Sequence, residues 1–178
     1  DLQLALETHA TSKLVQEIDL LAVRTLGFRG EALPSIGRVS RLELTTADGE
    51  TPEGWRVQVD GGHIGPFEPT GRSRGTTVRV ADLFFNSPVR KRFLKGPQGE
   101  VRLVSRLVVA MALAHPWIGF RLLHRGQTVF DLPAAEDLST RVTQIHGLSF
   151  LARLLPLECA TVSGSIRGYV GVPELARP

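Results

Sequence analysis

Apolar positions along the chain follow two periods, one typical of helices and one typical of strands. Residues 100–114 show the clearest helical period, because apolar side chains recur there about every three or four positions. The apolar residues of this helix are Val101, Val104, Val108, Met111 and Ala112. We expect them to be core residues, and we expect His115 and Pro116 to end the helix.

Shorter helices are expected near the N-terminus. Residues 1–8 place apolar side chains on one face, and residues 20–26 follow an aspartate that can cap them and end before Gly27. A third helix should begin after Gly30, where Glu31 brings an acid into the first turn.

Two further helices are expected later in the chain. Residues 88–95 follow a serine that can cap them, carry proline at the first helical position and end at Gly96. Residues 138–145 align apolar side chains on one face and are closed by Gly147. Around the first of these helices, four apolar residues are expected in the core, namely Leu83, Phe84, Phe93 and Leu94.

Strand-like stretches separate the helices and are bounded by glycine-containing turns. The expected strands are residues 38–46, 55–59, 76–80, 117–124, 127–130, 155–162 and 166–172. The turn signals are Asp48-Gly49, Gly61-Gly62, Arg125-Gly126 and Ser163-Gly164. The hairpin over 117–130 is expected to complete the sheet. Antiparallel strands with helices on one face predict an α+β fold.

Composition narrows the class of protein. The chain is 42% hydrophobic and 22% charged, which is ordinary for a soluble globular protein. No apolar run approaches the roughly 20 residues that a membrane span needs. The single cysteine, Cys159, excludes an internal disulfide and a cysteine metal cluster, and it suits a reducing, cytosolic compartment. The net charge of +3 is too small to argue for nucleic acid by itself.

The two ends of the sequence suggest a fragment of a longer protein. The chain starts with Asp1 instead of methionine, its only methionine is Met111, and it stops at Pro178. A simpler alternative is that flanking parts were never included in the sequence in hand.

The stretch Thr25–Ile36 carries the most specific chemistry. Gly27 and Gly30 bracket a bend, because glycine reaches positive φ and lets other groups approach the backbone. Arg29 would lie beside the free N–H groups at the start of the following helix, which makes an anion site suited to phosphate. The alternative is a loop entering a helix with Arg29 solvated, because short glycine-rich motifs often match by chance.

A second polar stretch precedes it. Thr11 and Ser12 offer hydroxyl groups and Lys13 offers a point charge, and together they can bind phosphate oxygens. The alternative is a polar loop with a helix cap. His9 is expected to be a packing or surface residue, because no partner acid can be identified from the sequence.

A basic cluster lies within the helix expected at 88–95. It consists of Arg90, Lys91, Arg92 and Lys95. These side chains could contact DNA phosphates. A solvated helix face is the alternative, because no aromatic or amide residues interleave to read bases.

These residues resemble a known family. Gly-Phe-Arg-Gly-Glu-Ala-Leu-x-Ser-Ile at Gly27–Ile36 resembles the signature of the MutL family of DNA mismatch-repair ATPases. Ala-Thr-Ser-Lys at Ala10–Lys13 is similar to the family motif next to the nucleotide. Gly75–Pro88 resembles the family pattern of a Gly-Thr turn, a strand, Asp-Leu-Phe and Asn-x-Pro. The resemblance covers essentially the whole chain, but only the middle of a MutL-type N-terminal region.

The resemblance implies a fold and a domain division. Residues 1–131 would form the C-terminal part of a GHKL-type (Bergerat) ATP-binding domain, an α/β sandwich with a mostly antiparallel sheet and helices on one face. Residues 132–178 would begin a ribosomal-S5-like transducer domain, after a linker at residues 132–137.

The resemblance also implies nucleotide-binding residues. These are Thr11, Ser12, Lys13, Gly27, Arg29, Gly30, Ala32, Leu33 and Thr76. For the complete protein it implies ATP and Mg²⁺ as cofactors, non-specific DNA binding, a MutS-type mismatch-recognition partner, a homodimer, no membrane and the bacterial cytosol. Its function would be to bind ATP and couple mismatch recognition to downstream repair.

Catalytic chemistry is expected to lie outside this chain. ATP hydrolysis needs a glutamate that activates water and an asparagine that holds Mg²⁺. No Glu-x-x-x-Asn-x-x-Asp or Asp-x-Gly-x-Gly occurs, and the one asparagine, Asn86, stands in another motif. We therefore assign no catalytic or metal residue and expect no hydrolysis by the chain alone. Two alternatives remain: another GHKL ATPase, or a non-catalytic DNA-binding or scaffolding member of the fold.

Overall fold

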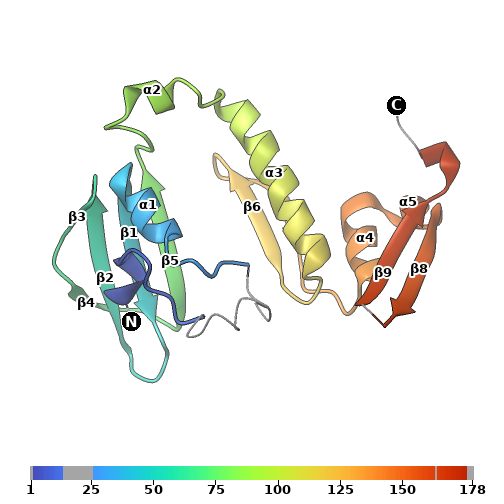
Figure 1. The fold of residues 1–178 in the computed structure, drawn as a ribbon, viewed down its shortest axis with the longest axis horizontal. Coiled ribbons are helices and arrows are strands. Elements are labelled where there is room, and N and C mark those ends of the chain that lie inside the picture. The colour runs from blue at the N-terminus through green and yellow to red at the C-terminus, as the bar shows by residue number, and fades with distance from the viewer. Residues whose placement is uncertain (1, 14–25, 163, 176–178) are drawn as a thin grey trace. The chain divides into compact units, whose positions relative to one another are not determined.

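The computed structural model describes residues 2–13, 26–162 and 164–175. It divides into two compact units, Asp1–Leu94 and Lys95–Pro178, and each builds its strand pairs from its own residues (Figure 1). The helix expected at 20–26 lies outside the described residues except for its last position, and so does the turn residue Ser163. None of the described helices is long and apolar enough to cross a membrane.

Strand β1 (Arg41–Ala47) lies inside an antiparallel sheet in the first unit, between β2 and β5. The other strands are β2 (Glu53–Asp60), β3 (His63–Ile64), β4 (Glu68–Gly71) and β5 (Gly75–Ala81). Both β3 and β4 pair with β2. The predicted turns are confirmed by φ angles of 86° at Gly49, 56° at Gly61 and 99° at Gly62.

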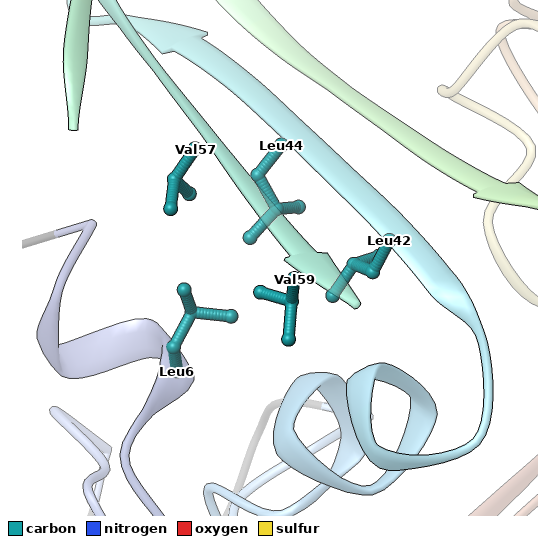
Figure 2. Packing of buried hydrophobic residues seen from close by; sticks show 5 residues of the cluster. All are labelled: Leu6, Leu42, Leu44, Val57 and Val59. Atoms are coloured by element: carbon teal, nitrogen blue, oxygen red, sulfur yellow. The ribbon is translucent and has the colours of Figure 1, made fainter. Parts of the chain in front are cut away.

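The core of this unit lies on one face of the sheet (Figure 2). Leu42 and Leu44 of β1 alternate with polar residues and are buried together with Val57 and Val59 of β2 and Leu6. Helix α1 (Ala32–Arg38) adds Leu33 and Ile36 to this cluster. The predicted helix after Gly30 is therefore confirmed, and its apolar side chains anchor it to the sheet.

The helix expected at residues 1–8 is reduced to a single 3₁₀ turn, η1 (Leu4–Leu6). No side chain caps its start, and Glu7 has extended backbone angles (φ −82°, ψ 137°) that end it. Leu6 nevertheless points into the core, as the apolar pattern predicted.

The helix expected at 88–95 is also shorter than predicted. Helix α2 (Pro88–Lys91) is one turn long, and the Ser87 side chain makes no capping hydrogen bond. After α2 the chain leads to Gly96, which is the N-cap of the next helix. The Lys95 N–H donates to the Glu100 carboxylate of that helix at 2.6 Å. That helix is α3 (Pro97–Ala114), which starts three residues before the predicted position.

Several residues expected in the core are exposed in the described structure. In α3, Ala112 is fully buried, but the Val104 side chain is 43% exposed. Around α2, Phe93 is 80% exposed, and Leu83 and Leu94 are also exposed. Only Phe84 is half-buried, and its N–H donates to the Val39 carbonyl at 2.6 Å. Periodicity identified an apolar face here, but a face is buried only where another element covers it.

Asn86 has a structural role in this unit. Its side-chain amide donates to the carbonyl oxygen of Arg38 at 2.8 Å, at the end of α1. Carbonyls at helix ends lack intrahelical partners, so this bond satisfies one of them.

The second unit contains the long helix α3, two hairpins and two shorter helices. The first hairpin pairs β6 (Phe120–His124) with β7 (Gln127–Leu132), and the second pairs β8 (Leu154–Thr161) with β9 (Gly164–Gly171). Both were predicted. Helices α4 (Leu138–His146) and α5 (Leu148–Leu151) lie between them in the chain, and a 3₁₀ turn, η3 (Pro173–Leu175), follows.

The prediction that the first hairpin completes the sheet stays a prediction, because the hairpin and the sheet belong to different units. Within the second unit, hydrogen bonds join β6 to β7 as a two-stranded sheet. The turn itself is encoded locally, since Arg125 (φ 51°) and Gly126 (φ 78°) both adopt positive φ. Which strand pairs with the outer edge of a hairpin depends on contacts distant in sequence, which local patterns do not encode.

Helix α4 is held by a buried arginine. Arg141 is fully buried, and its guanidinium donates to the carbonyls of Pro116 and Ile118 at 2.6 Å each and to the Gln144 side chain at 2.8 Å. At its start, the Asp137 carboxylate accepts the Thr140 N–H at 2.8 Å, and Gly147 (φ 85°) closes it as predicted. The α4 region is thus joined to the segment that precedes β6.

Candidate functional site

A cleft of about 1130 Å³ lies in the first unit, between two segments that are separated in the sequence. Residues 9–13 contribute one side, together with Leu4 and Ala5, and residues 26–34 contribute the other. The second segment runs from the loop before α1 into its first turn. Both segments belong to the same unit, so their relative placement is defined.

Eight of the nine predicted nucleotide-binding residues line this cleft. They are Thr11, Ser12, Lys13, Gly27, Arg29, Gly30, Ala32 and Leu33. The ninth, Thr76, is not among the lining residues and lies on β5. Its hydroxyl shares a 2.8 Å hydrogen bond with the Thr46 hydroxyl on β1. Its nucleotide role therefore remains a prediction.

Gly30 brings the two segments into close backbone contact. Its φ is 63°, and a Cβ added there would overlap the carbonyl oxygen of Ala10. Glycine is required here both because it accepts positive φ and because it leaves room for the opposite backbone. The bend predicted at Gly30 is therefore the point where residues 9–13 and 26–34 meet.

Many of the side chains that line the cleft are apolar, and each of the two segments adds one cation, Lys13 or Arg29. The Lys13 N–H donates to the Thr11 hydroxyl at 3.2 Å, which folds the segment into a tight turn. The Arg29 guanidinium lies 5.6 Å from the centroid of the Phe28 ring. Neither Lys13 nor Arg29 is paired with a carboxylate in the described part of the chain. Both charges remain available to an anion.

The sequence did not reveal one contact in the cleft. His9 Nδ1 lies 3.1 Å from Glu31 Oε1, so the partner acid of His9 is the residue at the N-cap of α1. No local pattern links the two residues, because many residues separate them in the chain. Glu31 was predicted in the first turn of this helix, and it lies one residue before that turn, at the N-cap.

No group of three or more metal-binding side chains occurs within residues 2–13, 26–162 and 164–175. The basic residues Arg90 and Lys91 lie on the exposed α2, and Arg92 ends it. Lys95 belongs to the second unit.

Relatives of this chain are known, although no protein-family model matches it. It is 42% identical over 177 residues to the DNA mismatch repair protein MutL of Anoxybacillus flavithermus, covering 99% of this chain and 29% of that protein. It is also 42% identical over 174 residues to MutL of Anaeromyxobacter dehalogenans, covering 98% of this chain and 29% of the relative. The chain therefore spans less than a third of these relatives.

Solved structures agree with the sequence matches. The Aquifex aeolicus MutL ATPase domain complexed with ADP is 32% identical, with a TM-score of 0.65 over 82% of this chain and 56% of that one. A second structure of the ATPase domain from the same mismatch repair endonuclease is 28% identical, with a TM-score of 0.64 over 88% of this chain and 57% of the other. The helices and antiparallel sheet described above thus occur in the GHKL fold of MutL ATPase domains. The chain belongs to the MutL family of DNA mismatch repair proteins and corresponds to a fragment of their N-terminal region.

Proposed function

We propose that the cleft binds the phosphate groups of ATP or ADP and forms the lid and phosphate side of a MutL-type ATPase site. One observation carries this proposal. Two motifs that lie apart in the sequence line one cleft, and each brings to it a cation, Lys13 or Arg29, that has no carboxylate partner among the residues the structure describes. A related ATPase domain has been solved in complex with ADP, which supports the same ligand class here.

The chemistry of the lining suits a polyphosphate. The Thr11 and Ser12 hydroxyls can hydrogen-bond to phosphate oxygens, and Lys13 can act as a point charge. Arg29 can form two parallel hydrogen bonds to one phosphate. Gly30 lets the backbone approach closely where a side chain would block it.

We expect hydrolysis to need groups from outside this chain. A bound Mg²⁺ would neutralise charge on the phosphates, but among the described residues Glu31 is the one carboxylate that lines the cleft, and it contacts His9. The Mg²⁺ ligands, the general base and the adenine pocket would come from other parts of the complete protein. We expect weak nucleotide binding and no Mg²⁺-dependent turnover by the 178-residue chain.

For the complete protein we propose the role that its relatives' names describe, DNA mismatch repair. ATP binding would order the lid segment and promote a homodimer, and the dimer would couple a MutS-type recognition protein to strand removal on DNA in the bacterial cytosol. Ordering of a loop by phosphate contacts is a common basis for such switches. We also propose that the transducer domain begins at residue 132.

Titration of a fluorescent ADP analogue against the chain tests the phosphate site. The double variant Lys13→Ala, Arg29→Ala should bind at least about tenfold more weakly, because two charge-assisted contacts are lost. Arg102→Ala is the matched control, since it removes an exposed arginine on α3 outside the cleft. Equal affinities of the double variant and the control would place the phosphate site elsewhere.

A further inference from the structure

The pair formed by His9 and Glu31 links the two sides of the cleft. The imidazole Nδ1 lies 3.1 Å from the carboxylate Oε1, and the two residues belong to facing segments. Both side chains are partly exposed, 79% for His9 and 49% for Glu31, so the pair contributes little to overall stability. Because His9 and Glu31 line the cleft from its two facing segments, we expect the pair to shape the cleft rather than to stabilise the whole fold.

The backbone has positive φ on both segments beside the pair. His9 has φ 65°, in the left-handed region that histidine, asparagine and aspartate enter more often than other residues except glycine. Gly30, next to Glu31, has φ 63° and abuts the carbonyl of Ala10, next to His9. The two left-handed residues therefore flank the contact between the segments, and the His9–Glu31 pair lies beside it.

Charge gives the second argument. Among the described residues that line the cleft, Glu31 is the one acid, and Lys13 and Arg29 are the one lysine and the one arginine. A carboxylate turned toward a polyphosphate would repel it, and the repulsion is strong over short distances. The contact with His9 gives this carboxylate a partner on the opposite segment.

We propose that the His9–Glu31 pair is a positioning clasp for nucleotide phosphates. It holds residues 11–13 against residues 27–33, and it keeps the Glu31 carboxylate directed at His9 rather than at the ligand. The proposal rests on the proposed function, because it assumes that the phosphates occupy this cleft. Neither residue is a catalytic residue, since neither acts on the reacting atoms.

Binding of the fluorescent ADP analogue to four variants of the chain tests the clasp. His9→Ala and Glu31→Gln should each weaken binding about two- to fivefold, because each weakens one exposed contact between the two segments. The double variant should bind no more weakly than His9→Ala alone, because one interaction is removed either way. His9→Gln, which keeps an N–H donor, should stay within about twofold of the original chain.

Two binding outcomes would overturn the clasp. Tighter binding by Glu31→Gln would show that the carboxylate only repels the ligand. Fully additive losses in the double variant would show that His9 and Glu31 act independently.

A measurement without nucleotide separates this inference from the proposed function. Amide hydrogen exchange of residues 10–13 should be faster in His9→Ala and Glu31→Gln, while exchange in β1 and β2 stays unchanged. Unchanged exchange at residues 10–13 would overturn the clasp whatever the nucleotide result. Faster exchange in a chain that binds no nucleotide would support the link between the segments and refute the phosphate site.

Discussion

The two units of this chain are stabilised by different chemistry. In the first, five aliphatic side chains from β1, β2 and η1 form a cluster whose members are all buried. In the second, the largest fully buried side chain is Arg141, a cation that is held by two backbone carbonyls and one amide. The first arrangement removes apolar surface from water, while the second must replace the hydration of a charge with hydrogen bonds.

The difference shows which interactions tolerate substitution. An aliphatic cluster accepts other apolar side chains of about the same volume, so the loss of stability on substitution depends mainly on the change in volume. A buried guanidinium needs acceptors in fixed directions, and it leaves its Nε without a partner within the described residues. The second unit therefore depends on the exact path of the chain at Pro116 and Ile118, where the acceptors lie.

The comparison can be tested separately in each unit, because each unit contains one tryptophan. Trp55 lies on β2 in the first unit, and Trp117 precedes β6 in the second. In a Trp117→Phe background fluorescence reports on the first unit, and in a Trp55→Phe background it reports on the second.

The largest effect is expected from a cavity in the aliphatic cluster. Leu44→Ala should lower the free energy of unfolding seen by Trp55 by about 2–5 kcal/mol, because the side chain is fully buried and the cavity refills poorly. Urea denaturation followed by fluorescence measures it. Val78→Ala on β5 is the control, since Val78 pairs with Leu44 across the sheet but is 48% exposed. A control as costly as Leu44→Ala would contradict the assigned core.

A smaller effect is expected from the buried cation. Arg141→Met keeps much of the side-chain volume but leaves the Pro116 and Ile118 carbonyls without their donor, which should cost about 1–3 kcal/mol in the Trp117 transition. Arg121→Met is the matched control, because Arg121 is exposed and forms a surface ion pair with Asp131 at 3.3 Å. If both variants cost the same, the hydrogen bonds of Arg141 do not stabilise the second unit.

A third variant tests how much the stability of the first unit depends on glycine at position 30 of the cleft. Gly30→Ala should cost about 1–2 kcal/mol in the Trp55 transition, because alanine disfavours positive φ and its Cβ would overlap the Ala10 carbonyl. Gly27→Ala is the control, since a Cβ at Gly27 meets no atom within 4 Å. Equal costs for the two alanine variants would argue against the close contact between the two cleft segments.

The same comparison explains how much of the structure could be predicted from sequence. Alternation in β1 and β2, glycine turns and the helix after Gly30 are local signals, and they identified the main strands of the sheet. The eight residues that line the cleft were instead implied by the resemblance to the MutL family. The sequence could not show that Phe93 is exposed, because exposure depends on whether another element covers that side chain. It also could not pair His9 with Glu31 or Arg141 with Pro116, since those contacts join residues far apart in the chain.

The smallest effect on stability is expected from Asp137, the N-cap of α4, whose charge lies at the surface of the second unit. The Thr140 N–H, and then the Thr140 and Ser139 hydroxyls, hold the pKa of the Asp137 carboxyl below its ordinary value. A depressed pKa means that the folded state favours the carboxylate. Its contribution is therefore complete above the ordinary pKa of about 4 and is lost as pH falls through the lower folded value.

Asp137→Asn separates the cap from the charge, because asparagine also caps helices but does not titrate. The Trp117 melting temperature of the original chain should exceed that of Asp137→Asn slightly at pH 7, and the difference should shrink as pH falls below 4. Glu136→Gln, which changes the neighbouring acid, serves as the control. A difference that grows on acidification would reverse the assigned direction of the Asp137 pKa. A constant difference would mean that the amide caps less well and that ionisation contributes nothing. The expected result would show that the second unit uses charge both inside, at Arg141, and outside, at Asp137, whereas the core of the first unit uses none.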